Sequence, residues 1–304
     1  MIPQEITREH VLAVLREIDR TGIPKERQAA EYMVVHGGKL YPEKYVVSLA
    51  SRFALGKELG PHSFSGGRET VRFLTARGFP IVRMTAWEGA VARLGERHRA
   101  VPGEPGLREI VGSKAEVTGK FGRIFSAGHL PVTTGEEFSA FLGYARQRGW
   151  IGPRGPGGWQ GGDVRVYRER LALLLDESRH VAARVDAFGA VDIASAILHI
   201  AHPNKYGVLS RPVEDALRKA GIFPVLREGA TPGATYAAVN EVLLALAGAT
   251  GMDPWTLCAI LHALGEGAWA QEPRSLPEAF RDAIAIAGIV QKKGLHGKSL
   301  ARGP

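Results

Sequence analysis

The chain has almost no cysteine and no long uncharged apolar run. Its one cysteine, Cys258, excludes an internal disulfide and a cluster of metal-binding thiolates. The most apolar stretch, residues 236–265, is interrupted by Asn240, Glu241 and Asp253, so we expect no membrane-spanning helix. The first residues also lack the basic-then-apolar pattern of a secretory signal. Together these absences predict a soluble protein of the reducing cytoplasm.

The composition is that of a folded globular protein with a basic surface. Hydrophobic residues make up 45% and charged residues 23% of the 304 positions, which leaves room for two domains. The net charge is +8, and residues 1–83 alone carry 13 Lys and Arg against 9 acids. A surplus of this kind suits an anionic partner such as a nucleic-acid backbone, although a merely solvated surface has the same composition.

Apolar residues at helical spacing predict a mainly α protein. Glycine- and proline-rich breaks divide it into a helical head domain at 1–83, a connector at 84–110, a second helical domain at 111–290 and a basic flexible tail at 291–304. The expected helices cover 7–19, 25–35, a segment from Tyr41-Pro42 to about 53, 69–76, 88–99, 134–147, 163–185, 189–201, 211–220, 235–249, 254–264 and 277–290. A short strand is expected at 79–84.

The head contains the run Lys39-Leu-Tyr-Pro-Glu-Lys-Tyr-Val-Val-Ser-Leu-Ala, followed by Phe64-Ser-Gly-Gly-Arg-Glu-Thr and Arg77-Gly-Phe-Pro-Ile-Val. Over about residues 5–83 this resembles the N-terminal head module of restriction endonucleases that cut modified DNA. The nuclease half of those enzymes has no counterpart, because the sequence lacks a His-Asn-His signature and cysteine pairs for a structural zinc.

The resemblance implies DNA binding by the head. Backbone N–H groups at the start of a helix suit a phosphate oxygen, and basic side chains would add to them. The alternative is a tight turn in which Ser65 caps the helix. The candidate DNA-binding residues of the head are Lys39, Lys44, Arg52, Ser65, Gly66, Gly67 and Arg68.

The second domain contains Ala182-Ala-Arg-Val-Asp-Ala-Phe-Gly-Ala-Val-Asp-Ile-Ala-Ser-Ala-Ile-Leu-His, a helix, a hairpin at Gly189 and a second apolar helix. Together with the proline-containing turn and the Val-Glu-Asp that follow, about residues 165–265 resemble the helix-hairpin-helix DNA glycosylases. The hairpin departs from the family's Pro-Gly-Val-Gly. The family's catalytic lysine falls at Val191 or Asp192, and its aspartate falls at Leu209 or Ser210.

Excision of a base needs a carboxylate near the sugar of a flipped nucleotide, where positive charge grows as the base departs. Asp192, Glu214 and Asp215 are the candidates, with Ser210 as a residue that would position water. Each acid also suits a first helical turn without any catalytic role.

Other candidates surround this predicted site. We expect DNA contacts from Lys120, Arg123, Phe188, Gly189, Lys205, Tyr206 and Arg211, and a stacking or wedge role for Trp150 and Trp159. His199 and His202 have the i, i+3 spacing of a metal pair, but a core or surface role is favoured because a third ligand is not evident. No metal or organic cofactor is implied.

The two resemblances give three hypotheses. The first is a monofunctional DNA glycosylase that flips out and excises a modified base, in defence against phage with modified DNA. The second is a non-catalytic reader of modified double-stranded DNA, which the missing aspartate favours. The third is a targeting subunit for a separate nuclease.

Overall fold

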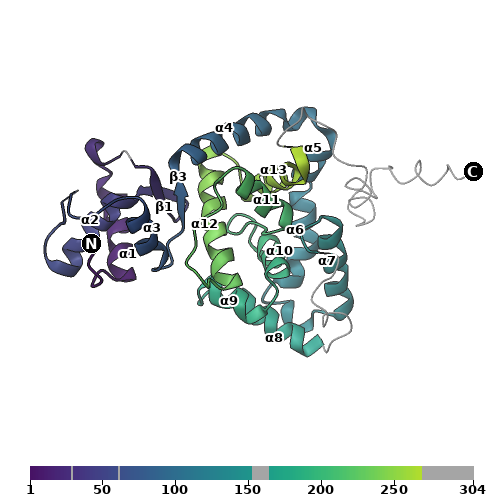
Figure 1. Ribbon diagram of the computed structural model, residues 1–304. Helices are drawn as coiled ribbons and strands as arrows, with labels where there is room; N and C mark the ends of the chain where they lie inside the picture. Colours follow the sequence, from purple (N-terminus) through teal and green to yellow (C-terminus); the bar gives the residue numbers. More distant parts are fainter. Residues whose placement is uncertain (29, 61, 153–163, 269–304) are drawn as a thin grey trace, which may run out of the picture. The chain divides into compact units, whose positions relative to one another are not determined.

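The computed structural model describes residues 1–28, 30–60, 62–152 and 164–268 (Figure 1). It is mainly helical, with 13 α-helices and one three-stranded sheet among these residues, so the predicted fold class is confirmed. No single described helix is long and apolar enough to cross a membrane; the segments Pro232–Thr250 and Pro254–Glu266, bent by 102° relative to each other, pass such a test only when combined.

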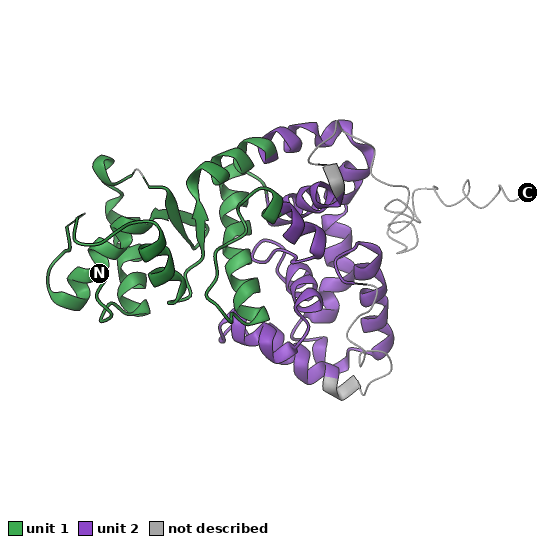
Figure 2. Ribbon diagram, in the orientation of Figure 1, with its two compact units in different colours: residues 1–93, 217–252 green, residues 94–216, 253–304 purple. Residues whose placement is uncertain are grey.

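The chain forms two compact units (Figure 2). Unit 1 comprises residues 1–93 and 217–252, and unit 2 comprises residues 94–216 and 253–304. This grouping differs from the predicted domain boundaries because residues 217–252, which include α12 (Pro232–Thr250), belong with the head. Two helices, α4 (Met84–Ala100) and α11 (Arg211–Lys219), run from one unit into the other.

Unit 1 is built around a small antiparallel sheet. Its strands β1 (Tyr32–His36), β2 (Lys39–Pro42) and β3 (Ile81–Arg83) lie in the order β2-β1-β3. The helices α1 (Arg8–Thr21), α2 (Glu43–Leu55) and α3 (Arg68–Thr75) contribute to one core with the sheet. α12 packs beside β1, and Val225 pairs with Ile81 at the sheet edge.

The prediction of a helix at 25–35 is wrong. Residues 25–27 form a single 3-10 turn, and β1 follows. The segment Tyr-Met-Val-Val-His is β-branched and aromatic, and β1 pairs on both sides. Gly37 and Gly38 both have positive φ and form the two-residue turn to β2, as a Gly-Gly pair commonly does in a β-hairpin. Tyr41 and Pro42 therefore end a strand, and the next helix begins at Glu43.

Three local predictions for unit 1 are confirmed. α1 corresponds to the helix predicted at 7–19, α3 to the helix predicted at 69–76, and β3 to the strand predicted at 79–84. Thr7 caps α1 as expected, with its hydroxyl accepting from the His10 amide. These segments were predictable because caps and apolar spacing agree.

Unit 2 is helical throughout its described residues. Its helices are the end of α4, α5 (Pro105–Gly112), α6 (Lys114–Gly122), α7 (Gly135–Gln147), α8 (Val164–Leu175), α9 (Val181–Phe188), α10 (Val191–Ala201), the start of α11 and α13 (Pro254–Ala263). Short 3-10 turns cover Val101–Gly103, Arg123–Phe125 (η3) and Leu130–Val132 (η4), and a π-helical turn covers Leu264–Ala268.

The helix predicted at 163–185 is two helices, α8 and α9, since Asp176 accepts hydrogen bonds from the amide and hydroxyl of Ser178 and forms a turn between them. The helices predicted at 134–147, 189–201, 235–249 and 254–264 correspond to α7, α10, α12 and α13. The helix predicted at 277–290 and the tail at 291–304 lie outside the described residues.

Candidate functional site

The Ser65–Gly67 turn leads into α3, as the sequence predicts, but carboxylates occupy its amides. Gly67 is the N-cap residue, with φ +66°, and its N–H donates to Glu43 Oε1 at 3.4 Å. The Ser65 N–H donates to Glu69 Oε2 at 2.9 Å. No side chain caps α3, so the capping role considered for Ser65 is wrong. Two amides of the predicted phosphate turn thus already have carboxyl partners from the same unit.

Glu43 is the residue that the sequence reasoning missed at this turn. Its side chain is only 4% exposed, and Oε1 also accepts from the Thr70 hydroxyl at 3.5 Å. Burial raises the pKa of this carboxyl, while the Gly67 amide partly opposes that shift. An acid in a first helical turn after proline looks ordinary in a sequence, so only the burial reveals it.

The basic residues predicted to bind DNA around this turn differ in whether an acidic side chain already forms an ion pair with them. Lys39 bonds Asp19 at 2.8 Å and Arg52 bonds Glu17 at 2.5 Å, both at the surface. The Lys44 ammonium lies 5.8 Å from the centre of the Phe64 ring. Lys39 lies on β2 rather than on the approach to a helix. DNA contacts from Lys39 or Arg52 would require exchange of these ion pairs.

Arg68 and Arg72 form the clearest cationic pair of the head. Both are exposed, and neither makes an ion pair or side-chain hydrogen bond within the described part of the chain. They are four residues apart on α3, so they share one face of the helix. Arg68 was predicted and Arg72 was missed, although the i, i+4 spacing in Arg68-Glu-Thr-Val-Arg72 is visible in the sequence.

The hairpin of unit 2 has the predicted local form. α9 ends at Gly189, which has φ +85° and ψ 0°, and α10 begins two residues later. The Gly189 N–H donates to the Val185 carbonyl at 3.1 Å, a helix C-cap bond rather than a contact to a partner. A side chain added at Gly189 would meet nothing within 4 Å, so this turn is open. Phe188 is 1% exposed, and its predicted contact with DNA is corrected to a core position.

The candidate acids differ in what they contact. Asp192 is half-buried in the first turn of α10; its Oδ1 accepts from the Ile193 amide at 2.9 Å and its Oδ2 from the Gly152 amide at 3.4 Å. Asp215 lies 3.9 Å from Arg211 across one helical turn, and Arg211 is 93% exposed. Glu214 is half-buried on the same helix.

The predicted water-positioning residue, Ser210, is buried just before α11. Its hydroxyl has no hydrogen-bond partner within the described segments. Because the side chain is 2% exposed, its hydroxyl does not reach solvent in this conformation.

Two further predicted DNA contacts adjoin each other. The Lys205 ammonium bonds Glu177 Oε1 at 2.7 Å, which raises the pKa of Lys205 and lowers the pKa of Glu177. Tyr206 is buried, and its hydroxyl accepts from Arg184 at 2.5 Å. Tyr206 is therefore corrected from a DNA contact to a core residue.

The basic segment before α7 remains at the surface. Lys120 is exposed, with its ammonium 5.3 Å from the centre of the Phe121 ring. Arg123 is also exposed and bonds Glu137 at 3.3 Å.

Trp150 is not a surface wedge. It is 6% exposed and packs edge-on against Tyr144, His199 and Trp255, with ring centres 5.5 to 5.7 Å away. An intercalating role needs an exposed side chain, so the prediction for Trp150 is corrected to a core role. Trp159 lies outside the described residues.

His199 belongs to the same aromatic core. Its ring stacks on Trp255 at 5.0 Å, and its Nδ1–H donates to the Tyr206 carbonyl at 2.7 Å. Burial lowers the pKa of His199 to about 4, so the ring is neutral at physiological pH. The core role favoured for His199 is confirmed, and no group of three potential metal-binding side chains occurs among the described residues.

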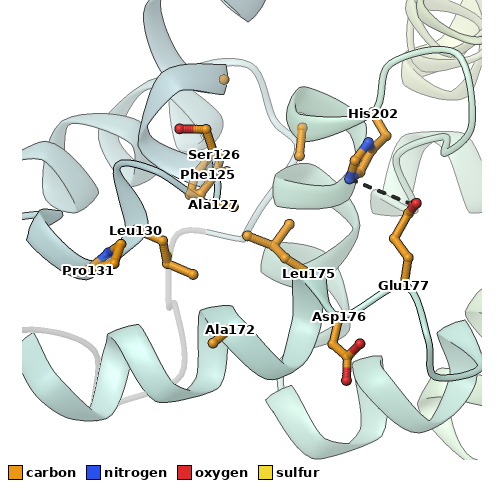
Figure 3. Close-up of a pocket in the computed structure, with 12 residues that line it drawn as sticks. Phe125, Ser126, Ala127, Leu130, Pro131, Ala172, Leu175, Asp176, Glu177 and His202 are labelled. Atoms are coloured by element: carbon orange, nitrogen blue, oxygen red, sulfur yellow. Dashed lines mark ion pairs between the residues drawn. The ribbon is translucent and has the colours of Figure 1, made fainter.

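A cavity of about 530 Å³ lies in unit 2 (Figure 3). Leu130 and Leu175 point toward one another across it, and His202 and Glu177 meet at one side, 3.8 Å apart. Asp176 points away from His202. None of the predicted catalytic residues lines this cavity. Its lining residues are Gly122, Phe125, Ser126, Ala127, Leu130, Pro131, Ala172, Leu175, Asp176, Glu177, Ala201 and His202.

Comparison with known proteins is informative for unit 1 only. No curated protein and no solved structure matches the chain. The resemblance of residues 165–265 to helix-hairpin-helix glycosylases is therefore without support from a relative, whereas the resemblance predicted for the head is confirmed. Residues 4–83 match the family model described as the ScoMcrA-like, N-terminal head domain.

Proposed function

We propose that this protein binds DNA through its head and recognises modified DNA in a restriction-type defence. The observation that carries the proposal is the match of residues 4–83 to the ScoMcrA-like head domain. The restriction endonucleases that the head resembles act on modified DNA, so the same target is expected here.

The exposed face of α3 is the proposed contact with the DNA backbone. Arg68 and Arg72 need not give up an ion pair to bind phosphate, whereas Lys39 and Arg52 do. Arginine is suited to this because its guanidinium donates to two phosphate oxygens at once. The Ser65–Gly67 amides are secondary in this proposal, because the Ser65 and Gly67 N–H groups already donate to Glu69 and Glu43.

Fluorescence anisotropy with labelled duplexes tests the proposal. We would compare unmodified, base-methylated, base-hydroxymethylated and phosphorothioate duplexes at several salt concentrations. The variant R68A/R72A should weaken binding to all duplexes and reduce the slope of log K against log salt by about 2, since two phosphate contacts are lost.

The matched control is R16A/R20A on α1, which removes the same charge from two exposed arginines without ion pairs in the described part of the chain. An equal loss in both double variants would assign binding to overall charge and contradict the α3 interface. Binding of no duplex would contradict the proposed function.

Base excision is the second candidate, favoured by the α9–Gly189–α10 hairpin and by the half-buried carboxylate of Asp192 at its helix start. In this version Asp192 stabilises the positive charge that develops on the sugar. A modified duplex is incubated with the protein and then treated with alkali; breaks that need alkali indicate a monofunctional glycosylase. Retained excision by both D192N and D215N would contradict the catalytic assignment, and binding without breaks would leave a reader.

A further inference from the structure

The cavity of unit 2 has features that neither the head match nor the hairpin explains. Its volume, about 530 Å³, falls within the range of about 300–1,000 Å³ typical of small-molecule sites. Its lining residues come from three stretches of the chain, 122–131, 172–177 and 201–202 (Figure 3). The predicted catalytic acids lie elsewhere, so this is a site of its own.

The interior is apolar and suits a flat ring. Leu130 and Leu175 approach from opposite sides, and Phe125, Ala172 and Ala201 complete the lining. An aromatic ring fills such a space with apolar contacts on both faces. A flexible polar chain would leave its polar groups without hydrogen bonds there.

Glu177 and His202 form one polar side of the cavity, whereas Ser126 lines another part and its hydroxyl donates to the Arg123 carbonyl at 2.8 Å. Glu177 Oε1 contacts Lys205 at 2.7 Å and His202 Nε2 at 3.8 Å. Glu177 Oε2 makes no hydrogen bond or ion pair with any described residue, and therefore remains an acceptor. Burial lowers the pKa of His202, which keeps its imidazole neutral and able to accept as well as donate.

The acceptor at this side disfavours an anionic group in direct contact with it. Glu177 is ionised, since the hydrogen bond from Lys205 lowers its pKa. Asp176 points away from His202 and lies 3.8 Å from Arg179, so it does not add to the charge at this side. A phosphate placed directly against Glu177 Oε2 would be repelled. An exocyclic amino group or ring N–H would instead donate to Glu177 Oε2, and charge-assisted bonds of this kind are the stronger ones.

We infer that this cavity binds a planar nitrogen heterocycle with an amino donor, the chemistry of the amino-bearing nucleobases. The inference deepens the proposed function and rests on it for biological meaning: the ring is either that of a free nucleoside or a base extruded from bound DNA. In both cases the ring enters the cavity and any phosphate stays outside.

Direct binding to the full chain tests the inference. The probes for isothermal titration are 2′-deoxycytidine and 2′-deoxyadenosine, with thymidine lacking the amino group and 2′-deoxycytidine 5′-monophosphate adding an anion. The two amino nucleosides should bind, and both comparison compounds should bind about tenfold more weakly or not at all. Absence of saturable binding by every probe would overturn the inference.

Two variants with matched controls locate the site. A172F places a ring in the cavity from an exposed position of α8, and its control L173F changes the next residue, which does not line the cavity. E177Q removes the anionic acceptor, and its control E136Q changes an exposed acid on α7. A172F and E177Q should each weaken nucleoside binding at least about tenfold, the loss of one charged hydrogen bond or of the ring contacts.

Thermal melting of all four variants shows whether the fold is retained. Binding unchanged in A172F and E177Q would overturn the inference, as would an equal loss in the control variants.

A duplex arm distinguishes the two sources of the ring. A duplex with 2-aminopurine brightens when that base leaves the stack, and A172F should reduce this signal while DNA affinity is retained if the base comes from DNA. Unchanged 2-aminopurine fluorescence together with nucleoside binding would assign a free nucleoside. Nucleoside binding without any DNA binding would reject the proposed function alone, whereas DNA binding without nucleoside binding would reject the cavity alone.

Discussion

Two glycine turns, Ser65–Gly67 before α3 and Phe188–Ala190 before α10, were both predicted to contact DNA, and they differ in which groups of the chain bond to them. At the first turn, Gly67 and Ser65 donate to the carboxylates of Glu43 and Glu69. At the second turn, the Gly189 N–H donates to the Val185 carbonyl of its own helix, Gly189 is exposed, and an added side chain would meet nothing within 4 Å. A glycine precedes the helix in both turns. This pattern alone therefore does not show whether distant acids of the same chain accept hydrogen bonds from the amides of the turn. The difference lies in whether a distant acid reaches the amides.

The largest expected effect comes from Phe188, the buried residue next to Gly189. F188A should lower the free energy of unfolding by about 3–5 kcal/mol, because it removes a ring that is 1% exposed in the chain's own core. F188L should cost less, since most of the volume remains. Chemical denaturation measures both. A stable F188A with weakened DNA binding would reverse the correction and return Phe188 to the interface.

The next test exchanges the glycines themselves. G67A should destabilise by about 2–3 kcal/mol, because φ +66° with ψ −122° is a conformation that only glycine adopts readily. G189A should cost about 1–2 kcal/mol, because φ +85° with ψ 0° is left-handed but unobstructed. G189N should recover part of that loss, since asparagine tolerates this region. Equal costs at both turns, measured by denaturation, would contradict the distinction drawn between them.

The pH dependence of stability tests the carboxyl at the closed turn. Burial raises the pKa of Glu43 above its ordinary 4.5, so the folded state holds this proton more tightly than the unfolded state. Stability from this group is therefore present below about pH 4.5 and is lost as pH rises through the raised pKa. The stability of the wild type relative to E43Q should fall as the pH rises above about 4.5. If the stability of the wild type relative to E43Q instead rises with pH, the hydrogen bond from the Gly67 amide lowers the pKa of Glu43 more than burial raises it.

The smallest effect concerns the acid beside the open turn. D192N should change the free energy of unfolding by less than about 1 kcal/mol, because its bonds to the Ile193 and Gly152 amides are only partly buried and an amide oxygen can replace one of them. If the hairpin contacts DNA, the same change should tighten binding about twofold to fivefold by removing a negative charge near phosphate. Anisotropy at low salt measures this. Unchanged affinity would place the contact away from α10.

The sequence predicted the fold best where local signals agreed. The Thr7 cap, the Gly189 hairpin and the mainly α class follow from caps and spacing that point the same way. The segment 25–35 was predicted wrongly because a strand at the centre of a sheet is stabilised by its neighbours. β1 pairs with β2 and β3, which both follow it in the chain, and a local pattern does not include them. A Gly-Gly pair between apolar runs was the available signal for that hairpin.

The candidate site was less predictable than the fold. Trp150, Phe188 and Tyr206 are aromatic residues near glycine or basic residues, a pattern that a binding surface shares with a core. Their burial depends on partners such as His199 and Arg184, whose side chains reach them through helix packing. The cavity combines residues from three separate stretches, 122–131, 172–177 and 201–202, so no local pattern in the sequence marks it.

The discontinuity of unit 1 has a consequence for how the protein is made. The head sheet is completed on one side by α12 and at its edge by Val225, both synthesised more than a hundred residues after β3. The nascent head therefore leaves the ribosome with that flank of β1 uncovered, while α5 to α10 emerge and fold. A truncated head would keep this bare flank permanently, and would be expected to associate with itself rather than remain monomeric.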